Sequence, residues 1–246
     1  MSSSGRPSVA GWAFPGAVIG ASRVVASVLG TDTPDPADVV GGLLAARLPE
    51  IPGARWASIT QRHDHNGFVT LVASADIARR IDDVQYELGD GPCLQALGGK
   101  VVAVDAETFR LRWSELATRV VADTPVRAVL SQPLSPISPH ATLGSLNLYS
   151  ERSEGFVATA MTAAADVAAA CALALVASAE RARADNLLVA LESSRQIGAA
   201  IGIMMARSGC TYEQGFAALR TASQRTHRKL RDVADEIVFT GDVPQY

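Results

Sequence analysis

Cysteine is scarce in this chain of 246 residues, which has Cys93, Cys171 and Cys210. The three are far apart and odd in number, and none belongs to a C-x-x-C pair. This spacing gives no disulfide framework and no zinc site, and it is typical of a protein from a reducing compartment. We therefore expect a cytoplasmic protein without a bound metal or resident cofactor.

The sequence also lacks a long apolar run. The longest such run, 167–179, is closed by Asp166 and Glu180 and is too short to cross a bilayer. The polar start of the chain, with Pro15 inside its broken apolar stretch, is a poor signal peptide. These features predict a protein that does not bind a membrane.

Residue patterns of common catalytic sites are missing as well. The segment Gly89-Asp-Gly-Pro is rich in glycine, but it does not have the G-x-x-x-x-G-K-[ST] pattern of a phosphate-binding loop. No Ser/His/Asp set and no pair of carboxylates stands out. We therefore expect a protein that is not an enzyme.

Apolar periodicity and turn residues divide the chain into a partly flexible segment 1–34, a domain at 35–180 and a domain at 181–246. Helices are predicted at 18–29, 37–48 and 113–121 and from Pro92, and strands at 55–62, 67–74, 101–104, 128–134 and 143–149. Residues 82–89 are read as the approach to a tight loop. This order predicts an α+β domain, an antiparallel sheet flanked by helices.

A helix is predicted from Phe156 to about Arg207, long enough to be a connector or a coiled coil. Its apolar and small residues follow an alternating spacing of four and three, which is that of a heptad seam. The seam consists of Leu187, Leu191, Ser194, Gly198, Ile201 and Met205. It either packs within its own domain or pairs two chains as a homodimer, and both can hold at once.

Two short helices are predicted after Ser208-Gly209 ends the long one. Thr211-x-x-Gln214 is a capping box for the first, whose core face is assigned to Phe216, Leu219 and Ala222. The second is expected to start near Thr226 or His227 and to end at Gly241. The C-terminal domain is therefore predicted to be a three-helix module.

Positive charge is concentrated in this module. The chain has a net charge of −3, whereas residues 181–246 contain nine Lys and Arg against seven Asp and Glu. No acidic residue occurs from Arg220 to Arg231. Arg can bind a phosphate or stack on a base, and Gln can bind a base edge, so this basic region predicts a nucleic-acid interface.

The C-terminal block resembles an ANTAR domain through Ile197-Gly198, Ala200, Gly202, Met204-Met205, Phe216, Leu219-Arg220, Ser223 and the run 228–234. The resemblance implies an RNA-binding domain that acts on hairpins in nascent transcripts and prevents transcription termination. The RNA-binding residues would be Arg220, Gln224, Arg225, His227, Arg228, Lys229 and Arg231. Ile201 stands where many members have Lys, which implies either a lost basic contact or a drier helix seam.

The domain at 35–180 resembles a GAF sensor domain through Tyr86-Glu-Leu-Gly-Asp-Gly-Pro-Cys93 and the strand LGSLNLYS at 143–150. The resemblance implies that this domain responds to a small-molecule or protein signal, which the sequence does not identify. The rim of its ligand pocket would include Tyr86, Gly89, Asp90, Gly91, Pro92 and Cys93.

Two alternatives remain open at this point. The short final helices and their basic joint also fit a DNA-binding helix-turn-helix regulator in outline, although the turn is less apparent in the sequence. A GAF-type redox enzyme would instead use Cys93 at a helix start as its reactive thiol.

Overall fold

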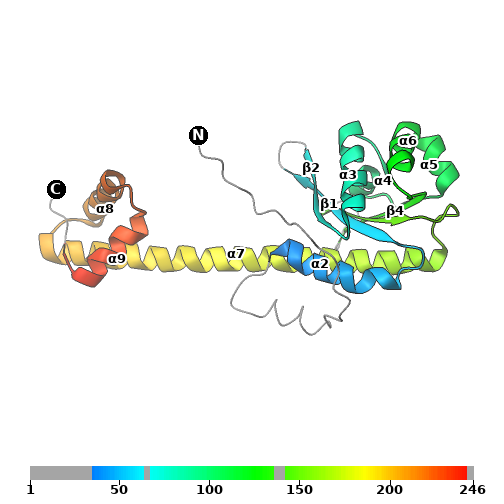
Figure 1. Ribbon diagram of the computed structural model, residues 1–246. Helices are drawn as coiled ribbons and strands as arrows, with labels where there is room; N and C mark the ends of the chain where they lie inside the picture. Colours follow the sequence, from blue (N-terminus) through cyan, green and yellow to red (C-terminus); the bar gives the residue numbers. More distant parts are fainter. Residues whose placement is uncertain (1–34, 64–66, 136–141, 243–246) are drawn as a thin grey trace. The chain divides into compact units, whose positions relative to one another are not determined.

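The computed structural model describes residues 35–63, 67–135 and 142–242 (Figure 1). The predicted helix at 18–29 and the N-terminal segment 1–34 that contains it lie outside these ranges. The chain divides into two compact units, Met1–Ala179 and Glu180–Tyr246.

The first unit contains an antiparallel sheet of five strands in the order β2-β1-β5-β4-β3. Its strands are β1 Trp56–His63, β2 Gly67–Ala73, β3 Val102–Val104, β4 Ala128–Pro133 and β5 Ser145–Ser150. All five match a strand expected from the sequence to within two residues at both ends. The predicted α+β class with an antiparallel sheet is confirmed.

Helices lie on both faces of this sheet. They are α2 Pro36–Arg47, the 3-10 turn η1 Leu48–Glu50, α3 Asp76–Leu88, α4 Pro92–Leu97, α5 Ala106–Arg112, α6 Ser114–Asp123 and α7 Ala158–Ser208. In Figure 1, α2 and the first part of α7 lie along one face, and α3 to α6 cover the other.

The two faces of the sheet differ in chemistry because successive residues of a strand point to opposite sides. One face is apolar: Ile59 and Leu148 pack with Val40 of α2 and Val167 of α7 in a single buried cluster. The opposite face has buried polar side chains at its centre, including Ser58 and its cross-strand partner Asn147. The candidate site of the first unit is built around this polar centre.

Two helices in this unit were not predicted. Helix α3 replaces the expected approach to a loop, with Ile77, Ile81, Val84 and Leu88 at helical spacing. It ends at Gly89, whose positive φ of 67° forms a left-handed C-cap. Helix α5 has seven residues and begins where the Asp105 side chain accepts a hydrogen bond from the Thr108 N–H (2.7 Å).

Helix α7 is the one helix in the described part of the chain that is long and apolar enough to cross a membrane. Its apolar residues Val167, Ala168, Cys171, Ala172 and Leu175 are buried against the sheet. Core helices of soluble proteins also pass such a test of length and composition, and this packing identifies the stretch as a core segment.

The second unit consists of the end of α7, α8 Tyr212–Thr226 and α9 Leu230–Thr240. The predicted capping box is present, with Gln214 N–H bonded to Thr211 Oγ1 and Thr211 N–H to Gln214 Oε1. Gly241 ends α9 with a φ of 71°, also as predicted. The core consists of Ala200, Met204, Leu219, Ala222, Val233, Ala234 and Ile237.

Two details of this unit were predicted wrongly. Helix α9 begins at Leu230 rather than near Thr226 or His227, because His227 takes a left-handed conformation (φ 53°) that ends α8. Phe216 does not belong to the core face of α8. It is 39% exposed, and Gly215 occupies the inward position beside it.

Candidate functional site

The joint between α8 and α9 is a three-residue turn, 227–229. Its shape is fixed by hydrogen bonds between two residues: Arg228 N–H donates to the Ser223 carbonyl (3.2 Å), and Ser223 Oγ donates to the Arg228 carbonyl (2.6 Å). Lys229 is the N-cap residue of α9. Arg228 and Lys229 therefore lie in the turn, and Arg231 alone of the predicted contact residues lies on α9.

The seven predicted RNA-binding residues are all exposed, but they do not have the same electrostatic partners. The Arg228 guanidinium bonds Glu236 and the Asp232 carbonyl, and Arg231 bonds the Asp232 carboxylate (3.3 Å). Within the described ranges, Arg220, Arg225 and Lys229 form no ion pair. These three residues are the cations most available to a phosphate.

Helix geometry divides the basic residues of α8 between two sides. Arg220 and Gln224 are four residues apart and share one side of the helix, whereas Arg225 lies about 140° around the axis from Arg220. Gln224 is exposed beside Arg220. The structure thus brings Arg220 and Gln224 together and separates Arg225 from them.

The predicted seam on α7 has two parts. Its upstream residues are open to solvent, with Leu187 61% and Leu191 58% exposed, and Ser194 and Gly198 are exposed as well. Ile201 is fully buried, and Met205 is 40% exposed. Ile201 therefore belongs to the core of its own unit. The part of the seam around Leu187 has no packing partner within that unit.

Ile201 packs against α8 at a glycine. A Cβ atom added to Gly215 would lie 3.1 Å from Ile201 Cγ2, so glycine permits this close helix approach. An apolar side chain suits such a position, where a Lys ammonium would be desolvated. Ile201 is thus a packing residue in this chain.

The polar centre of the sheet in the first unit is organised around Asp82 of α3. The Asp82 carboxylate accepts hydrogen bonds from Thr70 Oγ1 (2.9 Å), Asn147 Nδ2 (3.4 Å) and the Tyr149 hydroxyl. The hydroxyl of Tyr86, one turn along α3, bonds Thr60 and Thr70 (2.8 and 2.9 Å). A buried hydrogen-bond network therefore joins α3 to β1, β2 and β5.

The network leaves some buried oxygens without a donor. Within the described ranges, Asn147 Oδ1, Ser131 Oγ and Ser145 Oγ have no hydrogen-bond partner. Strand register places Ser131 opposite Asn147, and Ser145 lies two residues from Asn147, so the three share one face of the sheet. An unpaired buried polar atom costs about 1–3 kcal/mol, so a hydrogen-bond donor that reaches these oxygens would stabilise the fold.

Burial controls the ionisation of this cluster. It raises the pKa of Asp82 from its ordinary value of 3.8 to about 6, against the opposing effect of the hydrogen bonds from Tyr149, Ser58 and Thr70. Burial also raises the pKa of Tyr149 well above its usual range, and the Asp82 charge adds to this effect. Asp82 is therefore the group of this cluster that titrates near neutral pH.

The predicted pocket rim forms the connection from α3 to α4. Gly89 and Asp90 are exposed, whereas Gly91, Pro92 and Cys93 are buried, and Tyr86 is half-buried. Gly91 has a φ of 151°, and a Cβ atom there would overlap Gln85 Oε1. That oxygen accepts the Cys93 N–H (3.0 Å), so the glycine allows Gln85 to hold the start of α4.

Cys93 is in a poor setting for a reactive thiol. Its side chain is fully buried, and burial followed by the nearby Asp82 charge raises its pKa well above the usual value. Cys171 is also buried, which raises its pKa to about 12. Because the thiolate is the reactive form, these environments disfavour redox chemistry at either residue.

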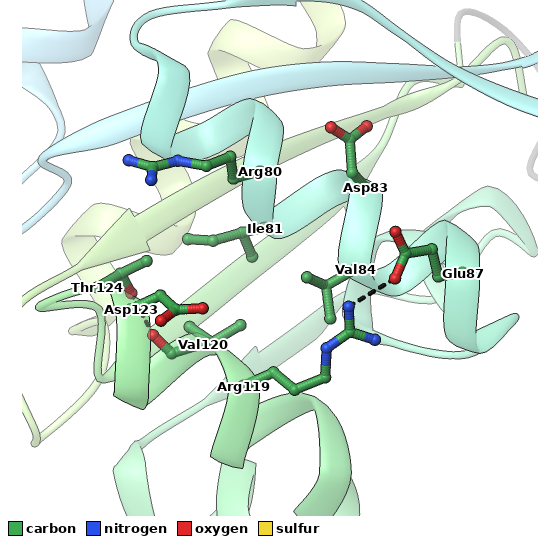
Figure 2. A pocket seen from close by; sticks show the side chains of 9 residues that line it. All are labelled: Arg80, Ile81, Asp83, Val84, Glu87, Arg119, Val120, Asp123 and Thr124. Carbon is green, nitrogen blue, oxygen red and sulfur yellow. Dashed lines mark hydrogen bonds and ion pairs between the residues drawn. The ribbon is translucent and has the colours of Figure 1, made fainter.

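A surface cavity of about 270 Å³ lies between α3 and α6, away from the predicted rim (Figure 2). Its walls mix charges of both signs, and Arg119 forms an ion pair with Glu87 across it. The lining residues are Arg80, Ile81, Asp83, Val84, Glu87, Arg119, Val120, Asp123 and Thr124. None of the six predicted rim residues lines this cavity.

Sequence reasoning missed Asp82, Gln85, Asn147 and Tyr149. Two usable indications were present. Asp82 and Tyr86 are four residues apart, so a helix at this point puts them on one face. Asn147 also lies inside a strand that is otherwise rich in Leu, where an amide requires a partner.

Comparison with protein families matches residues 185–238 to the ANTAR domain. Among solved structures, a domain attributed to a two-component sensor histidine kinase of Sinorhizobium meliloti 1021 is similar at 14% identity and a TM-score of 0.46, over 61% of this chain and 94% of that one. The GAF domain of the cyanobacteriochrome TePixJ is similar at 16% identity and a TM-score of 0.44, over 58% and 91%. Comparison with curated proteins gives no match. The second unit of this chain therefore contains an ANTAR domain, a domain of RNA-binding antitermination regulators.

Proposed function

We propose that this protein is a signal-responsive transcription antitermination regulator that binds hairpin RNA in nascent transcripts. The basic side chains of α8 and the 227–229 turn bind the hairpin, and the bound hairpin disfavours a terminator stem. The first unit acts as a GAF sensor domain for a small-molecule or protein signal.

The observation that carries this proposal is the match of residues 185–238 to the ANTAR domain. The exposed side chains of Arg220, Gln224, Arg225 and Lys229 support it, because they offer phosphate and base-edge contacts without an ion pair to break. Arg228 and Arg231 bind phosphate after exchanging their acidic partners, which costs little at an exposed surface.

The polar face of the sheet supports a sensing role for the first unit. A ligand that donates hydrogen bonds to Asn147, Ser131 and Ser145 would give the unpaired oxygens of this face their missing partners. The proposed ligand is therefore small and polar, and Tyr86 of the predicted rim already belongs to the network through Thr60 and Thr70.

Self-association through α7 is the proposed link between signal and RNA. The exposed Leu187 and Leu191 are spaced by four residues, as in a coiled-coil seam, and burying a leucine stabilises by about 1.5–3 kcal/mol. A homodimer would present two RNA-binding units, and the signal would change the pairing of these helices.

The decisive experiment measures binding of the full chain to a structured terminator-region RNA and to a random RNA of equal length at matched salt. We expect preference for the structured RNA, and read-through of the terminator in a transcription assay. The double variant R220Q/R225Q should lose affinity, whereas R110Q, an exposed arginine of the first unit, should not. Equal binding of both RNAs would refute the proposal.

The short α8–α9 turn favours one competing function, DNA binding by a helix-turn-helix, because such motifs join two helices by three or four residues. Competition between duplex DNA and hairpin RNA in one gel shift separates the two functions. Duplex DNA that displaces hairpin RNA at equal concentration would favour the helix-turn-helix regulator.

A further inference from the structure

The aromatic side chains that the structure describes in the second unit all lie outside its core. Tyr212 is 52% exposed, Phe216 39% and Phe239 92%. The core is built from Ala, Met, Leu, Val and Ile, and neither Tyr212 nor Phe216 is among the partly buried residues packed against it. Large apolar rings on a surface, next to free cations, point to a binding function.

Tyr212 and Phe216 continue the basic face of α8. Tyr212, Phe216, Arg220 and Gln224 are each four residues apart, so successive side chains lie about 6 Å apart along one winding stripe of the helix. The inward positions are taken by Gly215, Leu219 and Ala222. The stripe thus offers two rings, a guanidinium and an amide in sequence along the flank of α8.

This order of side chains matches the chemistry of unpaired RNA. Aromatic rings stack on bases of any sequence, Arg binds phosphate or stacks on a base, and an amide bonds a base edge. We propose that Tyr212 and Phe216 stack on unpaired loop bases of the RNA whose backbone Arg220 binds. The inference rests on the proposed function and adds the residues that recognise single-stranded RNA.

The charge around the stripe favours RNA over a protein partner. Arg220 and Gln224 extend it, and neither has an acidic partner among the described residues. Glu213 is the acidic residue of α8, and hydrogen bonds from its own backbone N–H and from Thr211 lower its pKa. Glu213 flanks the Tyr212 end of the stripe and lies about 10 Å along the helix from Arg220, so the end with Arg220 and Gln224 is the basic one.

The test compares full-length variants on two probes, an RNA hairpin with an unpaired loop and a blunt duplex with the same stem. F216L and Y212L should each weaken hairpin binding about tenfold, because one base stack is lost, and should leave the salt dependence unchanged. R220Q should instead reduce the salt slope by about 0.7, the value for one phosphate contact on a single strand. F216W should retain affinity, because it keeps a ring.

F239L is the matched control, because Phe239 is an exposed aromatic on α9 outside the stripe. It should leave hairpin affinity unchanged. Equal losses for F216L and F239L, or an equal loss of F216L on hairpin and duplex, would overturn the stacking inference and leave the proposed function intact. A change in oligomeric state for F216L, measured by sedimentation, would also overturn it and assign the ring to a second copy. Absence of RNA binding by the unmodified chain would refute both.

Discussion

The buried carboxyl of Asp82 gives the sharpest expectation for the first unit. In D82N the charge is removed while the shape is kept. The hydrogen bonds of Asp82 can be retained. The amide N–H that D82N introduces can donate to Thr70 Oγ1. Thr70 can then donate its own proton to the Tyr86 hydroxyl, with which it already forms a hydrogen bond. The carbonyl of the same amide can accept from Tyr149 and Asn147. D82N therefore isolates the cost of burying the charge.

The sign and size of the effect follow from the pKa. The folded-state pKa of Asp82 is about 6 and the ordinary value is 3.8, so the folded protein holds this proton more tightly. Its contribution to the free energy of unfolding is fully present below pH 3.8 and is lost as the pH rises through about 6. The total loss is about 3 kcal/mol at high pH. The free energy of unfolding of D82N, relative to that of the unmodified chain, should therefore increase by about 1.4 kcal/mol from about pH 5 to pH 8.

Urea unfolding followed by tryptophan fluorescence measures this gain. The described tryptophans, Trp56 and Trp113, belong to the unit Met1–Ala179, so their emission reports on the domain that contains Asp82. D76N removes an exposed carboxyl from the same helix and serves as the control. A stability difference between D82N and the unmodified chain that stays constant from about pH 5 to pH 8 would refute the reasoning.

Three other variants test separate parts of the molecule. E236Q removes the acidic partner that Arg228 must exchange for phosphate, so RNA affinity should rise about two- to fivefold in a filter-binding assay. D235N, which changes a neighbouring exposed carboxyl, should have less effect. L187E/L191E should raise the Kd of a homodimer at least about a hundredfold in analytical ultracentrifugation, because two buried leucines are lost from each protomer. V189E, on the other side of α7, should leave the Kd unchanged. G91A should destabilise the first unit by about 1–3 kcal/mol in the same urea assay, because its φ of 151° and the contact with Gln85 oppose a side chain there.

The sequence was informative where local rules decide the structure. The strands were found from alternating apolar residues and the start of α8 from the Thr211–Gln214 capping box, which the structure contains. Helix α5, with seven residues, was missed because so short a helix depends on tertiary packing more than on its own propensity. Helix α3 was missed although Ile77, Ile81, Val84 and Leu88 follow helical spacing, because the loop signal at 89–92 was extended back over it. The first residue of α9 was misplaced because the left-handed residue that ends α8 is His227 and not a glycine, the usual sequence signal for a helix end.

The candidate sites were predictable to different degrees for a physical reason. The basic residues between 220 and 231 lie close together in the sequence, so their charge was visible without a structure. The Asp82 cluster collects Thr70, Asn147 and Tyr149 from strands far apart in the chain. A charged residue is also rarely buried, so a sequence reading places Asp82 at the surface.

The error at Phe216 connects packing to function. An aromatic at helical spacing with Leu219 is ordinarily a core residue, but here Gly215 faces Ile201 across a contact that leaves no room even for a Cβ atom without adjustment. Helices that approach so closely pack through small and aliphatic side chains, so the ring is directed to the flank of α8. A ring outside the core adds little to stability, and its replacement by leucine should leave the unit folded. Any loss of RNA binding in F216L therefore reports on the interface itself.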